Sequence, residues 1–98
     1  MTAPPSPGAL IQAELWARDW SQMDLAEVMD RNAQWVNLVV NGKKTITRLS
    51  AAQLGAALGT TPEYWLDAQD AYRLHLLDQD PAHLAKLAAI RRRAGLTD

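Results

Sequence analysis

The sequence contains no cysteine, and this absence removes several kinds of chemistry at once. It excludes disulfide bonds, thiolate metal sites and a cysteine nucleophile. Two histidines, His75 and His83, remain for metal binding or general-base catalysis. They lie on either side of Pro81, and neither the His-x-x-x-His nor the His-Glu-x-x-His spacing occurs. We therefore expect no metal, no cofactor and no enzymatic activity.

Long apolar runs are also absent. No stretch approaches the roughly 18 consecutive apolar residues that a membrane-spanning helix needs. The N-terminus, MTAPPSPGAL, has no basic region followed by an apolar core, so it does not match a secretory signal. With 98 residues, 48% of them hydrophobic and 21% charged, the chain is expected to form one globular unit with a single core. These features predict a cytoplasmic protein with no membrane partner.

The chain lacks an overall excess of positive charge, since its formal net charge is −1. The acids are nevertheless unevenly distributed, and none occurs between Asp30 and Glu63. That interval carries four positive charges, from Arg31, Lys43, Lys44 and Arg48. A basic face suited to nucleic acid is therefore predicted despite the slightly acidic total.

Signals that start and stop helices recur along the chain, and the apolar residues between them follow a helical period. Residues 1–7 hold three prolines and are predicted to be a flexible arm. A first helix then runs to near Asp19. Ser21 and Asp24 have the spacing of a capping box, which opens a second helix. On this second helix we expect four buried side chains: Leu25, Ala26, Val28 and Met29.

Asn32 is a good N-cap for a third helix over residues 33–40, and Asn41-Gly42 tolerates the conformation that ends one. The Asn-Gly pair in LVVNGKKTIT also matches a hairpin turn, but the helical pattern on both sides favours an all-α protein. Three more helices are expected, beginning at Thr47 or Ser50, at Thr61-Pro62 and at Asp80-Pro81. The fifth is expected to bury Trp65, Leu66, Tyr72 and some of Leu74, Leu76 and Leu77.

The second and third predicted helices are joined by a short turn, as in a helix-turn-helix, whose second helix lies in the DNA major groove. Val36, Val39 and Val40 form the inward stripe of the third helix. Gln34 and Asn37 lie on the opposite face, and amide side chains can pair with adenine through two hydrogen bonds. Gln34 and Asn37 are therefore the candidates for base readout. The flanking Trp35 and Leu38 either press on thymine methyl groups or cover a neighbouring helix.

Polar and basic residues near the ends of these two helices are positioned to hold phosphates, which set register and affinity without reading sequence. Two lysines in isolation would more often be a solvated loop, but their acid-free surroundings favour phosphate contact. The predicted phosphate contacts are Gln22, Arg31, Asn32, Trp35, Asn41, Lys43, Lys44 and Thr45.

Three motifs resemble the HigA-type antitoxins of the XRE helix-turn-helix superfamily. They are SQ-x-x-LA at Ser21–Ala26, NGKK-x-IT at Asn41–Thr47 and ALGT-x-PE-x-W at Ala57–Trp65. The resemblance covers roughly residues 7–77, and the third motif is the most discriminating. It implies a five-helix bundle like the lambda repressor over residues 8–78, with an additional C-terminal helix in residues 79–98.

The resemblance also implies a function. Proteins of this type are homodimeric repressors that bind a palindromic operator in double-stranded DNA, and in toxin–antitoxin modules they silence an RNase toxin of HigB type. Carried over by position, the base-facing residues would be Ala33, Gln34, Asn37 and Leu38. Four positions depart from the family pattern. Asp30 replaces the usual glycine of the turn, and Trp35 stands where a small hydroxyl residue is common. Asn37 stands where serine is common, and Leu38 where a polar or charged residue is.

Two alternatives stay open on the sequence alone. A phage or prophage immunity repressor of Cro type would have the same fold and the same DNA-binding surface. A protein-interaction module that has lost DNA binding would instead use Trp35 and Leu38 to contact another protein. The basic tail, with Lys86, Arg91, Arg92 and Arg93, is either a further DNA or toxin contact or an ordinary helix end whose cations complement the helix dipole.

Overall fold

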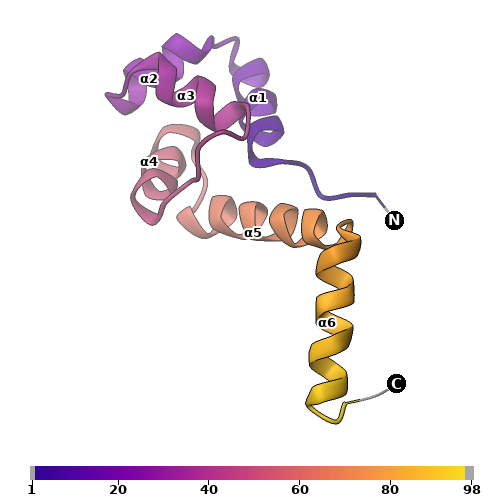
Figure 1. The fold of residues 1–98 in the computed structure, drawn as a ribbon. Coiled ribbons are helices and arrows are strands. Elements are labelled where there is room, and N and C mark those ends of the chain that lie inside the picture. The colour runs from indigo at the N-terminus through magenta and orange to yellow at the C-terminus, as the bar shows by residue number, and fades with distance from the viewer. Residues whose placement is uncertain (1, 97–98) are drawn as a thin grey trace.

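The computed structural model describes residues 2–96, which form six α-helices and contain no strand (Figure 1). The helices are α1 (Pro7–Arg18), α2 (Gln22–Met29), α3 (Ala33–Val40), α4 (Arg48–Leu58), α5 (Pro62–Asp78) and α6 (Pro81–Arg93). The all-α prediction is confirmed, and the Asn-Gly pair follows a helix instead of turning a hairpin. Met1 of the predicted arm and residues 97–98 of the predicted C-terminal extension lie outside the described residues. Within residues 2–96, no helix combines the length and apolar character needed to cross a bilayer.

Each helix begins at a side chain that accepts a hydrogen bond from the backbone of its first turn. The capping residues are Ser6, Ser21, Asn32, Thr47, Thr61 and Asp80. The predicted capping box is present, because Ser21 Oγ accepts from Asp24 N and the Asp24 carboxylate accepts from Ser21 N. Such caps stabilise a helix by about 1 kcal/mol each. They explain why the helix starts could be read from the sequence.

The start of α1 differs from the prediction in one respect. Pro7, which we placed at the end of the arm, is the buried first residue of α1, and Ser6 caps it. The next residue, Gly8, packs directly on the backbone at the end of α3. A Cβ atom at Gly8 would lie 2.0 Å from the carbonyl oxygen of Val40. The absence of a side chain at Gly8 therefore sets how closely α1 approaches α3.

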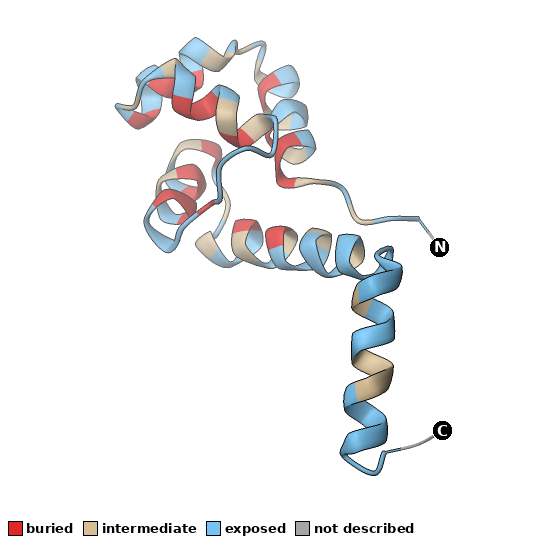
Figure 2. Cartoon of the chain, viewed as in Figure 1, coloured by how far each residue is buried: buried red, intermediate tan, exposed pale blue. Residues whose placement is uncertain are grey.

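The core lies between α1, α2, α3, α4 and the first half of α5 (Figure 2). It consists of Ile11, Leu15, Leu25, Ala26, Met29, Trp35, Val36, Val39, Ile46, Ala51, Leu54, Leu58 and Trp65. The prediction that Val28 is buried was wrong, since its side chain is 53% exposed. On α2 the inward arc runs through Leu25, Ala26 and Met29, and the helical period turns Val28 away from it.

The second half of α5 projects beyond the other helices, and α6 turns away from it, so the molecule measures 53 × 23 × 23 Å (Figure 1). Trp65 is completely buried, as expected, and Leu66 and Tyr72 are half-buried. The prediction that some of Leu74, Leu76 and Leu77 are buried was wrong, because all three are exposed. Within residues 2–96, no other helix lies along this end of α5 (Figure 1), and α6 itself contains no buried residue.

Candidate nucleic-acid interface

The interface is built on α2 and α3, which pack together through a short turn. Asp30 ends α2 in the left-handed conformation, with φ 55°, and its N–H reaches the carbonyl oxygens of Ala26 and Glu27. This conformation is uncommon for residues other than glycine, although aspartate tolerates it better than most. Asp30 thus performs the backbone role of a turn glycine, and it adds a negative charge beside a basic surface.

The inner face of α3 is buried and its outer face carries amides. Val36 and Val39 are buried and Val40 is half-buried, as the valine stripe predicted. Gln34 and Asn37 are exposed, while Ala33 and Leu38 are half-buried. These are the four residues predicted to face the bases; Gln34 and Asn37 are open to solvent, whereas Ala33 also packs against the core.

Asn37 also connects the two helices. Its Nδ2 donates to Gln22 Oε1 at the start of α2, at 3.3 Å. An amide nitrogen has two hydrogens, so Asn37 retains one donor and its oxygen for an adenine edge. Gln22 retains its own Nε2 group as a donor for a phosphate. The bond aligns a predicted base-reading residue with a predicted phosphate-contacting one.

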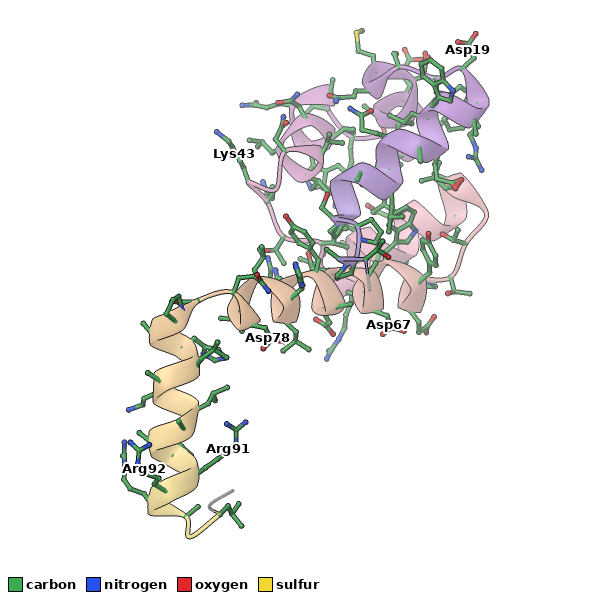
Figure 3. All side chains as sticks on the ribbon, turned by 90° about the vertical axis from the view of Figure 1, so that its right-hand side faces the viewer. Asp19, Lys43, Asp67, Asp78, Arg91 and Arg92 are labelled. Carbon is green, nitrogen blue, oxygen red and sulfur yellow. The ribbon has the colours of Figure 1, made fainter. Side chains whose placement is uncertain are left out.

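The loop after α3 carries Lys43, Lys44 and Thr45, and α5 holds it in place. Gln69 Oε1 accepts from Ile46 N at 2.8 Å, and Gln69 Nε2 donates to Ile46 O at 2.9 Å. Arg73 Nη2 donates to Thr45 Oγ1 at 2.8 Å. Both lysines remain exposed, and Lys43 points away from the helices (Figure 3). The hydrogen bonds to α5 thus fix the backbone of the loop, while the side chains of Lys43 and Lys44 stay exposed to solvent.

Sequence reasoning missed Gln69 and Arg73. The signal for Gln69 was present, because it lies four residues after the buried Trp65 on the inward face of α5. A polar residue at such a position needs a hydrogen-bonding partner when buried. Arg73 adds a cation beside the basic loop, next to Thr45, and nothing in the local pattern distinguished it from a solvated arginine.

Some predicted phosphate contacts already have partners within the protein. Asn32 Oδ1 accepts from Trp35 N at 2.8 Å as the cap of α3, and Asn41 Nδ2 donates to Asn37 O at 2.9 Å. Trp35 is only 7% exposed and belongs to the core, which supports the packing interpretation of this residue. A hollow of about 390 Å³ lies along this side of α3, lined by Asp30, Arg31, Asn32, Gln34, Trp35, Leu38 and Lys44.

The basic tail is remote from this surface. Arg91 and Arg92 lie near the far end of α6, well separated from Lys43 along the length of the molecule (Figure 3). Together with Arg93 they occupy the last turn of α6, where cations complement the negative end of the helix dipole. In one protomer these arginines and Lys43 therefore belong to separate surfaces.

Replacing Gln69 with leucine tests the anchoring of the basic loop. Gln69→Leu keeps the side chain's size but leaves the N–H and carbonyl groups of the buried Ile46 without partners. Unsatisfied buried groups cost about 1–3 kcal/mol each, so with two such groups the free energy of unfolding should fall by about 2–6 kcal/mol in chemical denaturation. The exposed Gln79, which caps the C-terminus of α5, provides the control: Gln79→Leu should change the free energy of unfolding by less than about 0.5 kcal/mol. Equal stability of the two variants would contradict an anchoring role.

Comparisons with known proteins agree with this geometry, although no family model matches the chain. An uncharacterized HTH-type transcriptional regulator from Haemophilus influenzae is 30% identical over 89 residues, which cover 90% of this chain and 83% of that protein. An addiction module antidote protein of the HigA family from Coxiella burnetii superposes with a TM-score of 0.75 at 32% identity, covering 87% of this chain and 95% of that one. The Pseudomonas aeruginosa antitoxin HigA, solved with the higBA promoter, gives a TM-score of 0.66 at 26% identity, covering 93% and 89% of the two chains.

The resemblance drawn from the three motifs is confirmed by these relatives. They match the chain across both the two-helix unit and the supporting helices, at an identity that goes beyond a shared fold. The chain belongs to the HigA family of helix-turn-helix transcriptional regulators.

Proposed function

We propose that the protein is a transcriptional repressor of antitoxin type, which binds double-stranded operator DNA by placing α3 in the major groove. The observation that carries this proposal is the two-sided character of α3: its valines are buried, and Gln34 and Asn37 are exposed toward solvent. A related antitoxin has been solved with its promoter. Such a protein works on the chromosome, so we expect it in the cytoplasm at the nucleoid and without catalytic activity.

The proposed division of labour follows from the chemistry of each group. Gln34 and Asn37 offer a donor and an acceptor each, and Ala33 and Leu38 offer apolar contacts to thymine methyl groups. Gln22 lies at the start of α2, and the two lysines, Lys43 and Lys44, lie in the loop after α3. All three would hold phosphates on either side of the groove. Phosphate contacts provide most of the affinity, and base contacts provide the sequence preference.

The antitoxin part of the proposal concerns a second partner. The Coxiella relative is an addiction module antidote protein, and we propose that this chain likewise neutralises an RNase toxin of HigB type encoded beside it. A small RNase reading frame next to the gene, whose toxicity this chain suppresses on co-expression, would support that role. A phage integration cassette in its place would favour the immunity repressor.

The rival function, a protein-interaction module that has lost DNA binding, is less consistent with the geometry. It relied on Trp35 and Leu38 as an apolar contact surface. Trp35 is 7% exposed and Leu38 is half-buried, so little apolar area remains on this face for another protein. The exposed groups there are amides and lysines, which suit nucleic acid.

We further propose that the repressor is a homodimer formed through α6 and the end of α5. Leu74 and Leu77 on α5, and Leu84 and Ile90 on α6, are exposed. A second copy would cover these side chains in a two-fold arrangement. Two copies related by such an axis would also match the two halves of a palindromic operator.

The dimer proposal predicts the mass of the protein in solution. The wild-type chain should sediment at twice its monomer mass of 10.8 kDa. Leu84→Glu, at a side chain that is 44% exposed, should leave the fold intact and shift the protein to monomer, because it places a charge inside the interface. Sedimentation velocity measures both. A monomeric wild-type protein would contradict the dimer. An unchanged dimer in the Leu84→Glu variant would show that α6 is not part of the interface.

Base readout and phosphate contact are separable by mutation. Gln34→Ala should weaken binding to the specific operator by about 1–3 kcal/mol and affect random duplex little, because it removes hydrogen bonds to a base. Lys43→Ala should weaken binding to both duplexes alike. Fluorescence anisotropy over a series of salt concentrations measures both effects. Equal loss on the two duplexes for Gln34→Ala would remove Gln34 from the reading set.

The acid in the turn gives a prediction with a matched control. Asp30 and Asp19 both end helices in the left-handed conformation, at φ 55° and φ 57°, but only Asp30 lines the hollow beside α3. Asp30→Asn keeps the tolerance for this conformation and removes a charge that repels phosphate, so affinity for random duplex should rise about two- to fivefold. Asp19→Asn should leave that affinity unchanged. A similar rise in both variants would indicate a general effect of net charge instead.

A further inference from the structure

Arg31 is held in an unusually defined position for an arginine at the edge of a surface. Its guanidinium carbon lies 4.2 Å from the centre of the Trp35 ring. Its Nε donates a hydrogen bond of 2.9 Å to Gln53 Oε1 on α4. Its backbone N–H donates to Ala26 O at 2.8 Å. One helix supplies the platform, another supplies the hydrogen-bond acceptor, and the turn fixes the main chain.

This arrangement leaves the outer edge of the guanidinium available. Within residues 2–96, the two Nη groups of Arg31 make no hydrogen bond or ion pair, while Nε is already engaged by Gln53. A guanidinium presents its donors in a rigid, planar fork that fits two oxygens of a phosphate or carboxylate. Because Trp35 and Gln53 orient this side chain before any ligand arrives, less conformational entropy is lost on binding.

The guanidinium group of Arg31 borders a hollow that Lys44 also lines. Arg31, Gln34, Leu38 and Lys44 line the hollow of about 390 Å³ beside α3. Asp30 also lines the hollow, so with Arg31 and Lys44 its charged lining residues sum to +1. An anion in this hollow would meet the guanidinium fork and an ammonium group, and it would lie next to the amide of Gln34.

From this geometry we infer a built phosphate site, in which the Arg31 fork grips one DNA backbone phosphate and Trp35 and Gln53 act as positioning residues. The inference rests on the proposed function, because DNA is the source of the phosphate. It also accounts for a tryptophan on a helix that faces nucleic acid: its ring supports the arginine from the core side. Neither Trp35 nor Gln53 needs to touch the DNA.

The positioning can be tested in the protein without DNA. In ¹⁵N NMR spectra, the Nε–H of Arg31 should give a resolved signal that exchanges slowly with water, because it is hydrogen-bonded and stacked. Gln53→Met keeps a side chain of similar length without the acceptor and should abolish this protection, as should Trp35→Leu. Since Trp35 is part of the core, Gln53→Met is the decisive variant. Unprotected Arg31 in the wild-type protein would overturn the positioning.

Binding to random-sequence duplex tests the phosphate assignment. A plot of log affinity against log salt concentration has a negative slope. Arg31→Met should make this slope less steep by about 0.9, the value of one phosphate contact. Arg31→Lys keeps the charge but loses the stack and the fork, and should weaken binding about two- to tenfold, as should Gln53→Met. Arg92 provides the matched control, because it is an exposed arginine in the last turn of α6, away from this surface. Arg92→Lys should stay within twofold of wild type.

The outcomes separate the two proposals. If the wild-type chain binds duplex and Arg31→Lys behaves like Arg92→Lys, the fork is overturned and the repressor function stands. If the loss appears on the operator and not on random duplex, Arg31 contacts a base, and the phosphate assignment is overturned. If the wild-type chain retains no duplex at low salt, the proposed function fails and the phosphate site fails with it, whatever NMR shows for Arg31.

Discussion

The burial of Val36 and Val39 is the interaction on which the rest of this protein depends. An isolated helix of the length of α3, which has eight residues, is not stable in water. It forms because its valines leave water against α1, α2 and the loop before α4, and burying each such side chain contributes about 1.5–3 kcal/mol. The same burial fixes the rotation of the helix, so that Gln34 and Asn37 can only face outward.

The supporting helices convert this orientation into a surface. α1 approaches the end of α3 closely enough that Gly8 touches the backbone at Val40, and α5 holds the following loop through both main-chain groups of Ile46. Arg73 bonds to Thr45 in that loop, and Arg31 lines the same hollow as Lys44 of the loop, in a molecule whose net charge is −1. Local segregation of charge, and not the total, makes the surface suitable for a polyanion.

The sequence predicted the helices well because their boundaries are encoded by local chemistry. A capping side chain such as Ser21 bonds to its own first turn, and proline at the first helical position, as at Pro62, needs no distant partner. Burial was harder to predict where it depends on what lies opposite. Leu76 follows the same helical pattern as a core residue, but it is exposed because α5 extends beyond the helices that form the core.

By itself, therefore, the sequence determined six helices, the inward valine stripe, the outward amides and the acid-free basic interval, since each depends on residues close together in the chain. Only the tertiary structure decided which side chains hold the surface in place. Gln53 and Gln69 lie more than 20 residues along the chain from Arg31 and Ile46, and no periodicity in one helix reports a partner on another. The physical reason is that caps and amphipathic faces are local properties, whereas an amide that supports an arginine or closes on a loop exists only once the helices have packed.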